Sequence, residues 1–170
     1  VHEGTICPNA MIAYWKLDET SGTAYSDFYD GHAGECAGDC PTPTVGHLGV
    51  GGGQEFDSDS TGIDVPLSLG DDTFDWGAHD SFSVEFWMKA DSANSCSLSN
   101  EVVVGRDGGL SGQLHWWAGV GCGAGGKAAF ALRDNAGVME GVESTTVVTD
   151  GLWHHVVAVR DASTDEVRIY

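Results

Sequence analysis

Short segments of alternating apolar and polar residues, separated by turn-forming residues, constrain this chain more than any other feature. Alternation with a period of two is the pattern of strands that bury only one face. Glycine, at 25 of 170 residues, clusters with aspartate and serine between the segments, where these residues favour turns. Because no stretch repeats apolar residues at intervals of three and four, we expect little helix. The segments are MIAYWKLDETSG (11–22), QEFDSDSTGIDVP (54–66), DSFSVEFWMKAD (80–91), NEVVVGRDG (100–108) and DGLWHHVVAVRD (150–161).

In this order the five segments resemble the laminin G-like, concanavalin A-like jelly-roll family in its bacterial extracellular form. The resemblance runs from about Cys7 to Tyr170 and implies an all-β, antiparallel two-sheet jelly-roll sandwich. We therefore expect an N-terminal lead-in over residues 1–10 and one domain over residues 11–170. The family includes lectins, adhesion modules and glycanases, so function has to be inferred from the site.

Alternation also predicts which face each strand buries. The first strand is expected at 11–17, with Met11, Ala13, Trp15 and Leu17 toward the core. The central strand is expected at 81–89, with Phe82, Val84, Phe86 and Met88 on one face and Glu85, Trp87 and Lys89 on the other. The other expected strands are 55–56 paired with 63–65 about a turn at 57–62, then 101–105, 113–118, 128–133, 147–148, 154–160 and 166–170.

Charge excludes two classes of partner. The chain has a formal net charge of −19, and residues 1–80 contain 15 acidic residues and one basic residue, Lys16. Nucleic acid and anionic membrane surfaces require a positive patch, so neither is an expected partner. No apolar run approaches the roughly 20 residues of a membrane helix, so no membrane insertion is expected. The acidic excess has two interpretations, a solubility surface or a calcium site.

The five cysteines lie in turn-rich segments, which favours disulfides over buried thiols. Zinc is the alternative, but Cys36 and Cys40 have no second matching pair to complete four ligands. Cys36 with Cys40 would close a small loop, and Cys96 with Cys122 would span the base of a hairpin, leaving Cys7 unpaired. Disulfides imply an oxidising compartment, and the chain begins as a mature secreted protein would, so we expect an extracellular protein, secreted or at the cell surface.

Calcium has two candidate locations in the acidic N-terminal half. Asp18 follows the first expected strand, and Asp27 and Asp30 flank a turn whose carbonyl oxygens could complete a ligand shell. The resembled family also has an aspartate at the position of Asp27, and many domains of this fold bind calcium nearby. The pair Asp57 and Asp59 is the other location, although a capped hairpin turn is the simpler interpretation there.

A ligand-binding face is expected where outward aromatic side chains gather with polar ones. If Val157 and Val159 face the core, His154 and Arg160 lie on the same outward face as Glu85 and Trp87. Alternation places one of Trp116 and Trp117 on the outward face. On the last strand Arg168 and Tyr170 point outward. Trp15 and Trp153 are assigned to the core. Aromatic faces with a few polar groups are typical of sugar sites, but Glu85 and the arginines could instead form a cross-strand charge ladder.

Three functions are compatible with these observations. We favour a non-catalytic binding or adhesion module that recognises glycan or an extracellular protein surface and has calcium as a structural ion. The second is a structural subunit of a surface layer or fibre. The third, a glycan-active hydrolase, is disfavoured because no strand carries the alternating carboxylates of the glucanase branch. In the resembled family this segment continues beyond the position of Tyr170, so we expect the domain to be incomplete at its C-terminus. The remaining strands would come from sequence beyond Tyr170 or from a neighbouring chain, through self-assembly or strand donation at that C-terminal edge.

Overall fold

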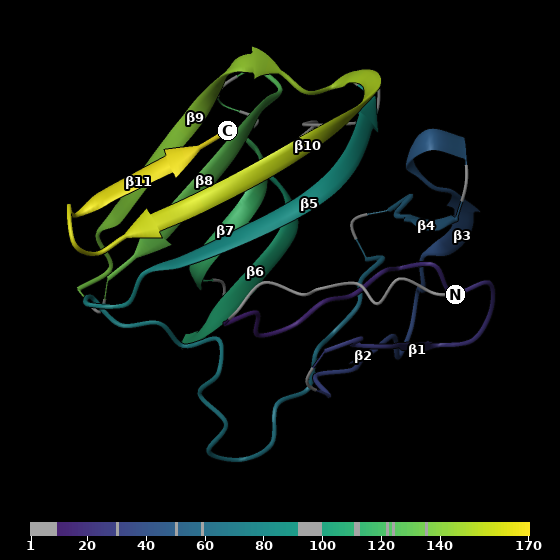
Figure 1. Ribbon diagram of the computed structural model, residues 1–170, viewed down its shortest axis with the longest axis horizontal. Helices are drawn as coiled ribbons and strands as arrows, with labels where there is room; N and C mark the ends of the chain where they lie inside the picture. Colours follow the sequence, from purple (N-terminus) through teal and green to yellow (C-terminus); the bar gives the residue numbers. More distant parts are fainter. Residues whose placement is uncertain are drawn as a thin grey trace. The chain divides into compact units, whose positions relative to one another are not determined.

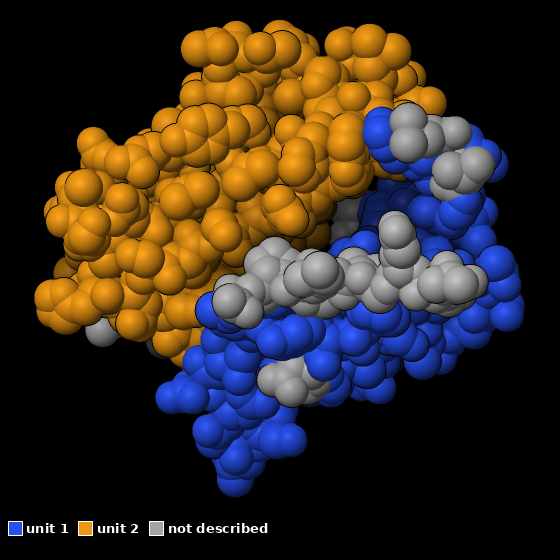
Figure 2. Space-filling view, viewed as in Figure 1, with its two compact units in different colours: residues 1–73 blue, residues 74–170 orange. Residues whose placement is uncertain are grey.

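The computed structural model of residues 1–170 describes residues 10–29, 31–49, 51–58, 60–91, 100–110, 113–121, 123, 125–134 and 136–170. Asp30, Asp59, Cys7, Cys96 and Cys122 lie outside the described residues, so the pairing expected of Cys96 and Cys122 is not addressed by the structure. The chain forms two compact units that meet in sequence between Thr73 and Phe74, coloured blue and orange in Figure 2. The described residues contain no helix that is both long and apolar enough to cross a membrane.

The first unit is built from two small hairpins. Strand β1 (Ala24–Tyr25) pairs with β2 (Gly34–Glu35), and β3 (Thr42–Val45) pairs with β4 (Gly52–Glu55), all antiparallel. Between β3 and β4 lies η1 (His47–Gly49), a single 3-10 turn. Little helix was expected from the sequence, and the structure confirms it.

Two strand predictions for this unit are wrong. Residues 11–17 form no strand, and only Trp15 makes an isolated bridge, to Asp27. A side chain replaces a strand partner here, because the Tyr14 amide donates to the Asp27 carboxylate at 2.8 Å. Likewise β4 pairs with β3 and not with residues 63–65, where Asp64 makes only a bridge to Glu35.

The expected small disulfide is confirmed. Cys36 and Cys40 are bonded to each other, with their Cα atoms 5.5 Å apart, and Cys36 is buried. The bond closes the short loop that follows β2.

The second unit is an antiparallel sandwich of two sheets, which confirms the expected fold class (Figure 1). One sheet has the order β11–β10–β5 and the other the order β6–β7–β8–β9. The bounds are β5 (Phe82–Asp91), β6 (Glu101–Leu110), β7 (Gln113–Gly121), β8 (Lys127–Arg133), β9 (Met139–Val147), β10 (Asp150–Asp161) and β11 (Glu166–Ile169). Strand β9 is much longer than the two residues expected at 147–148.

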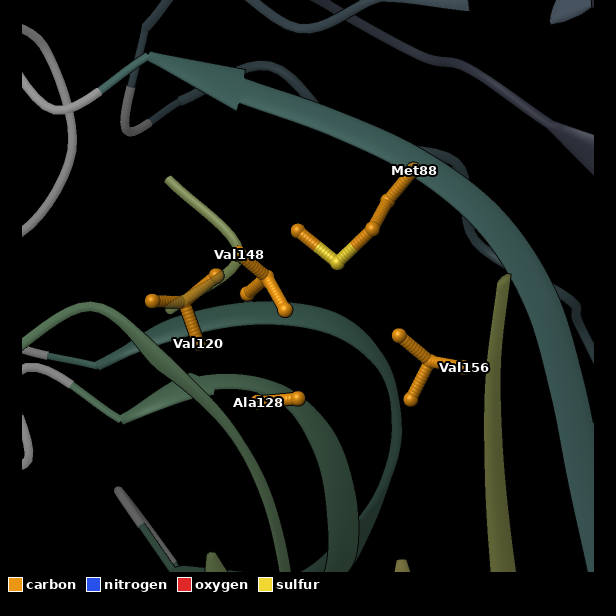
Figure 3. Packing of buried hydrophobic residues seen from close by; sticks show 5 residues of the cluster. All are labelled: Met88, Val120, Ala128, Val148 and Val156. Atoms are coloured by element: carbon orange, nitrogen blue, oxygen red, sulfur yellow. The ribbon is translucent and has the colours of Figure 1, made fainter. Parts of the chain in front are cut away.

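The core lies between the two sheets. Met88 of β5 and Val156 of β10 point toward Val120, Ala128 and Val148, as Figure 3 shows. A second cluster joins Ala118, Phe130 and Ala158, all fully buried, with partly buried neighbours that include Phe82, Phe86, Val167 and Ile169. The apolar face predicted for β5 therefore faces the core, and the opposite face of β5 is turned to solvent.

The loop before β5 closes one end of the sandwich. Trp76 stacks on Phe82 with ring centroids 3.7 Å apart and an interplanar angle of 16°, and it lies 4.9 Å from the Trp116 ring. Arg106 fixes the same loop through two hydrogen bonds to the Asp75 carboxylate, at 2.7 and 3.1 Å. Paired donors on one carboxylate give a more directional contact than a single exposed ion pair.

Candidate ligand-binding face

The outward face of the β11–β10–β5 sheet carries the candidate site, and strand register decides which residues lie on it. Trp87 lies opposite His155, Glu85 opposite Val157, and Lys89 opposite Trp153. Directly opposed residues of an antiparallel pair point to the same side of the sheet. On the other side of β10, Val157 exchanges two backbone hydrogen bonds with Tyr170, which brings Tyr170 to this side as well. We call this surface the β5–β10–β11 face, made of Ser83, Glu85, Trp87, Lys89, Trp153, His155, Val157, Val159, Arg168 and Tyr170.

At its centre Trp87 and His155 form a stacked pair. Their ring centroids are 4.9 Å apart at an interplanar angle of 27°, and Trp87 is 48% exposed. The His155 Nε2 atom lies 3.7 Å from Glu85 Oε2, and these two side chains are 41% and 66% exposed. An aromatic platform is thus held beside a hydrogen-bonding carboxylate and imidazole, and all three groups are open to solvent.

The charge-ladder alternative applies to β11 and not to Glu85. Arg168 forms ion pairs with Glu166 and with Asp161, the latter at 3.5 Å. The hydrogen bond from Arg168 to Glu166 raises the pKa of the guanidinium above its ordinary value. Glu85 instead lies near the His155 imidazole, so it remains beside the aromatic pair.

The expected outward position of His154 and Arg160 is wrong. His154 lies opposite Met88 and Arg160 opposite Phe82, on the core-facing side of β10. Val156 and Ala158, and not Val157 and Val159, fill the core, so the face presented by β10 is shifted by one residue and His155 takes the expected place of His154. His154 instead approaches Asp150, with 2.8 Å between Nε2 and Oδ1, and this contact lowers the pKa of the Asp150 carboxyl.

The two adjacent tryptophans belong to the other sheet. Trp116 lies on its core side, where it is buried and its Nε1 donates to the Phe74 carbonyl at 3.0 Å. Trp117 lies on the opposite side, buried with Ala129 and Ala131. Neither joins Trp87, whereas Trp153, assigned to the core from the sequence, lies on the β5–β10–β11 face and is partly buried.

The candidate calcium ligands do not form a ligand shell among the described residues. The Asp27 side chain is fully buried, and its carboxylate accepts the backbone amides of Tyr14, Tyr29 and His32 at 2.8, 2.9 and 3.1 Å. Asp18 is exposed, and within the described residues no three histidine, cysteine or acidic side chains are grouped to hold a metal. Asp27 therefore organises its loop through amide donors, and calcium binding stays a prediction.

Calcium binding predicts a higher melting temperature in the presence of the ion, because a ligand that binds only the folded state stabilises it by mass action. The measurement is thermal unfolding of the protein with millimolar calcium and with excess chelator. Magnesium at equal concentration is the control for ionic strength. Identical melting curves with calcium and with chelator would remove calcium from the description of this protein.

Comparison with known proteins identifies the fold family. Residues 59–170, which are more than half of the chain, match the laminin G-type family model described as the concanavalin A-like lectin/glucanases superfamily. No curated protein matches the chain, and no solved structure matches it.

Proposed function

Because this chain belongs to the concanavalin A-like lectin/glucanases superfamily, we propose that it is a non-catalytic, extracellular carbohydrate-binding module whose binding surface is the β5–β10–β11 face. The observation that supports this assignment most is the exposed Trp87 ring, stacked on His155 beside Glu85. The Cys36–Cys40 disulfide supports the extracellular location, because such bonds persist in oxidising compartments.

The geometry of the pair suits sugar recognition. The C–H face of a pyranose ring packs on an indole, and its hydroxyl groups need acceptors and donors at the ring edge. Trp87 offers the packing surface, and the Glu85 carboxylate and the His155 imidazole, within 3.7 Å of each other, offer the hydrogen-bonding groups. The paired strands hold the backbones of both residues side by side, so the two rings are adjacent before a ligand binds.

Substitution of Trp87 by alanine is expected to weaken polysaccharide binding about tenfold or more and to leave folding intact. Loss of a central tryptophan typically costs about 2 kcal/mol or more of binding free energy, and about 1.4 kcal/mol is a tenfold change. The measurement is retardation in affinity gels containing cellulose, chitin, xylan, mannan or mixed-linkage β-glucan. Dextran sulfate serves as the polyanionic comparison.

Tyr29→Ala is the matched control, since Tyr29 is an exposed aromatic residue of the first unit. Equal retardation of the wild type, Trp87→Ala and Tyr29→Ala would show that the β5–β10–β11 face is not the binding surface. Failure of every polysaccharide to retard the wild type would favour a protein partner or self-assembly. Release of reducing sugar from any of them would reveal a hydrolase instead.

A further inference from the structure

The aromatic groups of the β5–β10–β11 face extend well beyond Trp87. Trp153 lies one step along the sheet from the Trp87–His155 pair, and Tyr170 lies one step in the opposite direction. Each step is two residues, or about 7 Å, and neighbouring strands are about 4.8 Å apart. The aromatic groups therefore span about 13 Å along the strands and all three strands across the sheet.

This face is an open platform and not a pocket. Tyr170 is 69% exposed and Trp87 48% exposed, and the Glu85 side chain is 66% exposed. A site that encloses the end of a chain would bury most of the ligand and most of its own lining side chains. Groups as exposed as these can contact only one side of a ligand, which must then gain affinity by extending over several of them.

The charges on the platform indicate a neutral ligand. Glu85 and Lys89 lie on either side of Trp87 along β5, with opposite charges, and Arg168 is already ion-paired with Glu166 and Asp161. The whole chain has a net charge of −19, which repels a polyanion. Sulfated or uronic-acid-rich chains are therefore poor partners for this surface.

We infer that the β5–β10–β11 face binds internal units of a neutral, linear polysaccharide, with Trp87 at the centre and Tyr170 and Trp153 as outlying contacts for further sugar units. This inference rests on the proposed function and adds the class of ligand. In this arrangement Tyr170 contributes through its ring, so a phenylalanine can replace it.

The test is titration calorimetry with cello-, xylo-, manno- and chito-oligosaccharides from the mono- to the hexasaccharide. We expect affinity to rise at least about tenfold from mono- to hexasaccharide in the series that binds. Tyr170→Ala should weaken hexasaccharide binding about three- to tenfold, as expected for one aromatic contact, and leave monosaccharide binding nearly unchanged. Tyr170→Phe should bind as the wild type does, and Tyr14→Ala, an exposed tyrosine of the first unit, is the control.

The outcomes separate this inference from the proposed function. If mono- and hexasaccharides bind equally while Trp87→Ala abolishes binding, the face recognises a single sugar and the inference is wrong although the function stands. If Tyr170→Ala and Trp153→Ala both leave the length dependence intact, the outlying contacts are wrongly assigned. If no oligosaccharide binds and Trp87→Ala changes nothing, both the function and the inference are wrong.

Discussion

Replacing Phe130 with alanine is expected to lower the free energy of unfolding by about 3–5 kcal/mol, the range for deletion of a buried aromatic ring. Phe130 lies on β8 and is fully buried between the two sheets, edge-on to the Phe82 ring at 6.0 Å. Its removal would leave a cavity that strand-bound neighbours cannot close. Since a domain of ordinary stability unfolds with about 5–15 kcal/mol, the loss would be a large share of the total.

Urea or guanidinium unfolding followed by circular dichroism measures this effect. Val138→Ala is the control, because Val138 is exposed in the same unit and should change stability by less than about 0.5 kcal/mol. A Phe130→Ala variant as stable as Val138→Ala would mean that the two sheets do not pack around this ring.

Trp116→Ala is expected to have an effect of similar size, about 3–5 kcal/mol, for a different reason. The Trp116 ring joins the end of the core to the loop before β5, because it lies 4.9 Å from Trp76 and 5.9 Å from Phe82. The substitution removes a buried ring and also leaves the Phe74 carbonyl without the indole donor. The loop that closes this end of the sandwich would then keep the Trp76–Phe82 stack but lose its contact with the Trp116 ring.

Trp116→Phe separates the two contributions. Phenylalanine keeps most of the packing but cannot donate, so its cost should be closer to about 1 kcal/mol, the usual net value of one hydrogen bond. Unfolding monitored by tryptophan fluorescence and by circular dichroism should give the same midpoint in each variant. A phenylalanine variant as unstable as the alanine variant would show that the hydrogen bond, and not ring packing, fixes the loop.

Alternation predicted the faces of β5 correctly but not those of β10. In β5 large apolar residues alternate with Ser83, Glu85, Trp87 and Lys89, so only one face can be buried. Residues 156–159 of β10 are all apolar, so periodicity gives no preference between their two faces. The pairing with β5 decides, and it places His155 beside Trp87. A face made by two strands could not be predicted from one of them.

The first unit was predicted least well. Residues 11–17 alternate as a strand would, yet the Tyr14 amide donates to the Asp27 side chain and Trp15 makes only a single bridge. Such a partner is distant in sequence and leaves no periodic signal. The Cys36–Cys40 bond was predictable because loop closure over so few residues is local. Strand β9 was missed because its glutamate, serine, threonine and glycine residues resemble those of turns.

The stacking of Trp87 on His155 across two paired strands has a thermodynamic consequence. Both residues belong to strands whose opposite faces form the core, through Phe86 and Met88 on one and Val156 and Ala158 on the other. The backbones that carry the two rings stay together as long as β5 remains paired with β10. A ligand that binds to the two rings would therefore order little of the backbone. The loss of backbone conformational entropy would offset little of the free energy gained from its contacts.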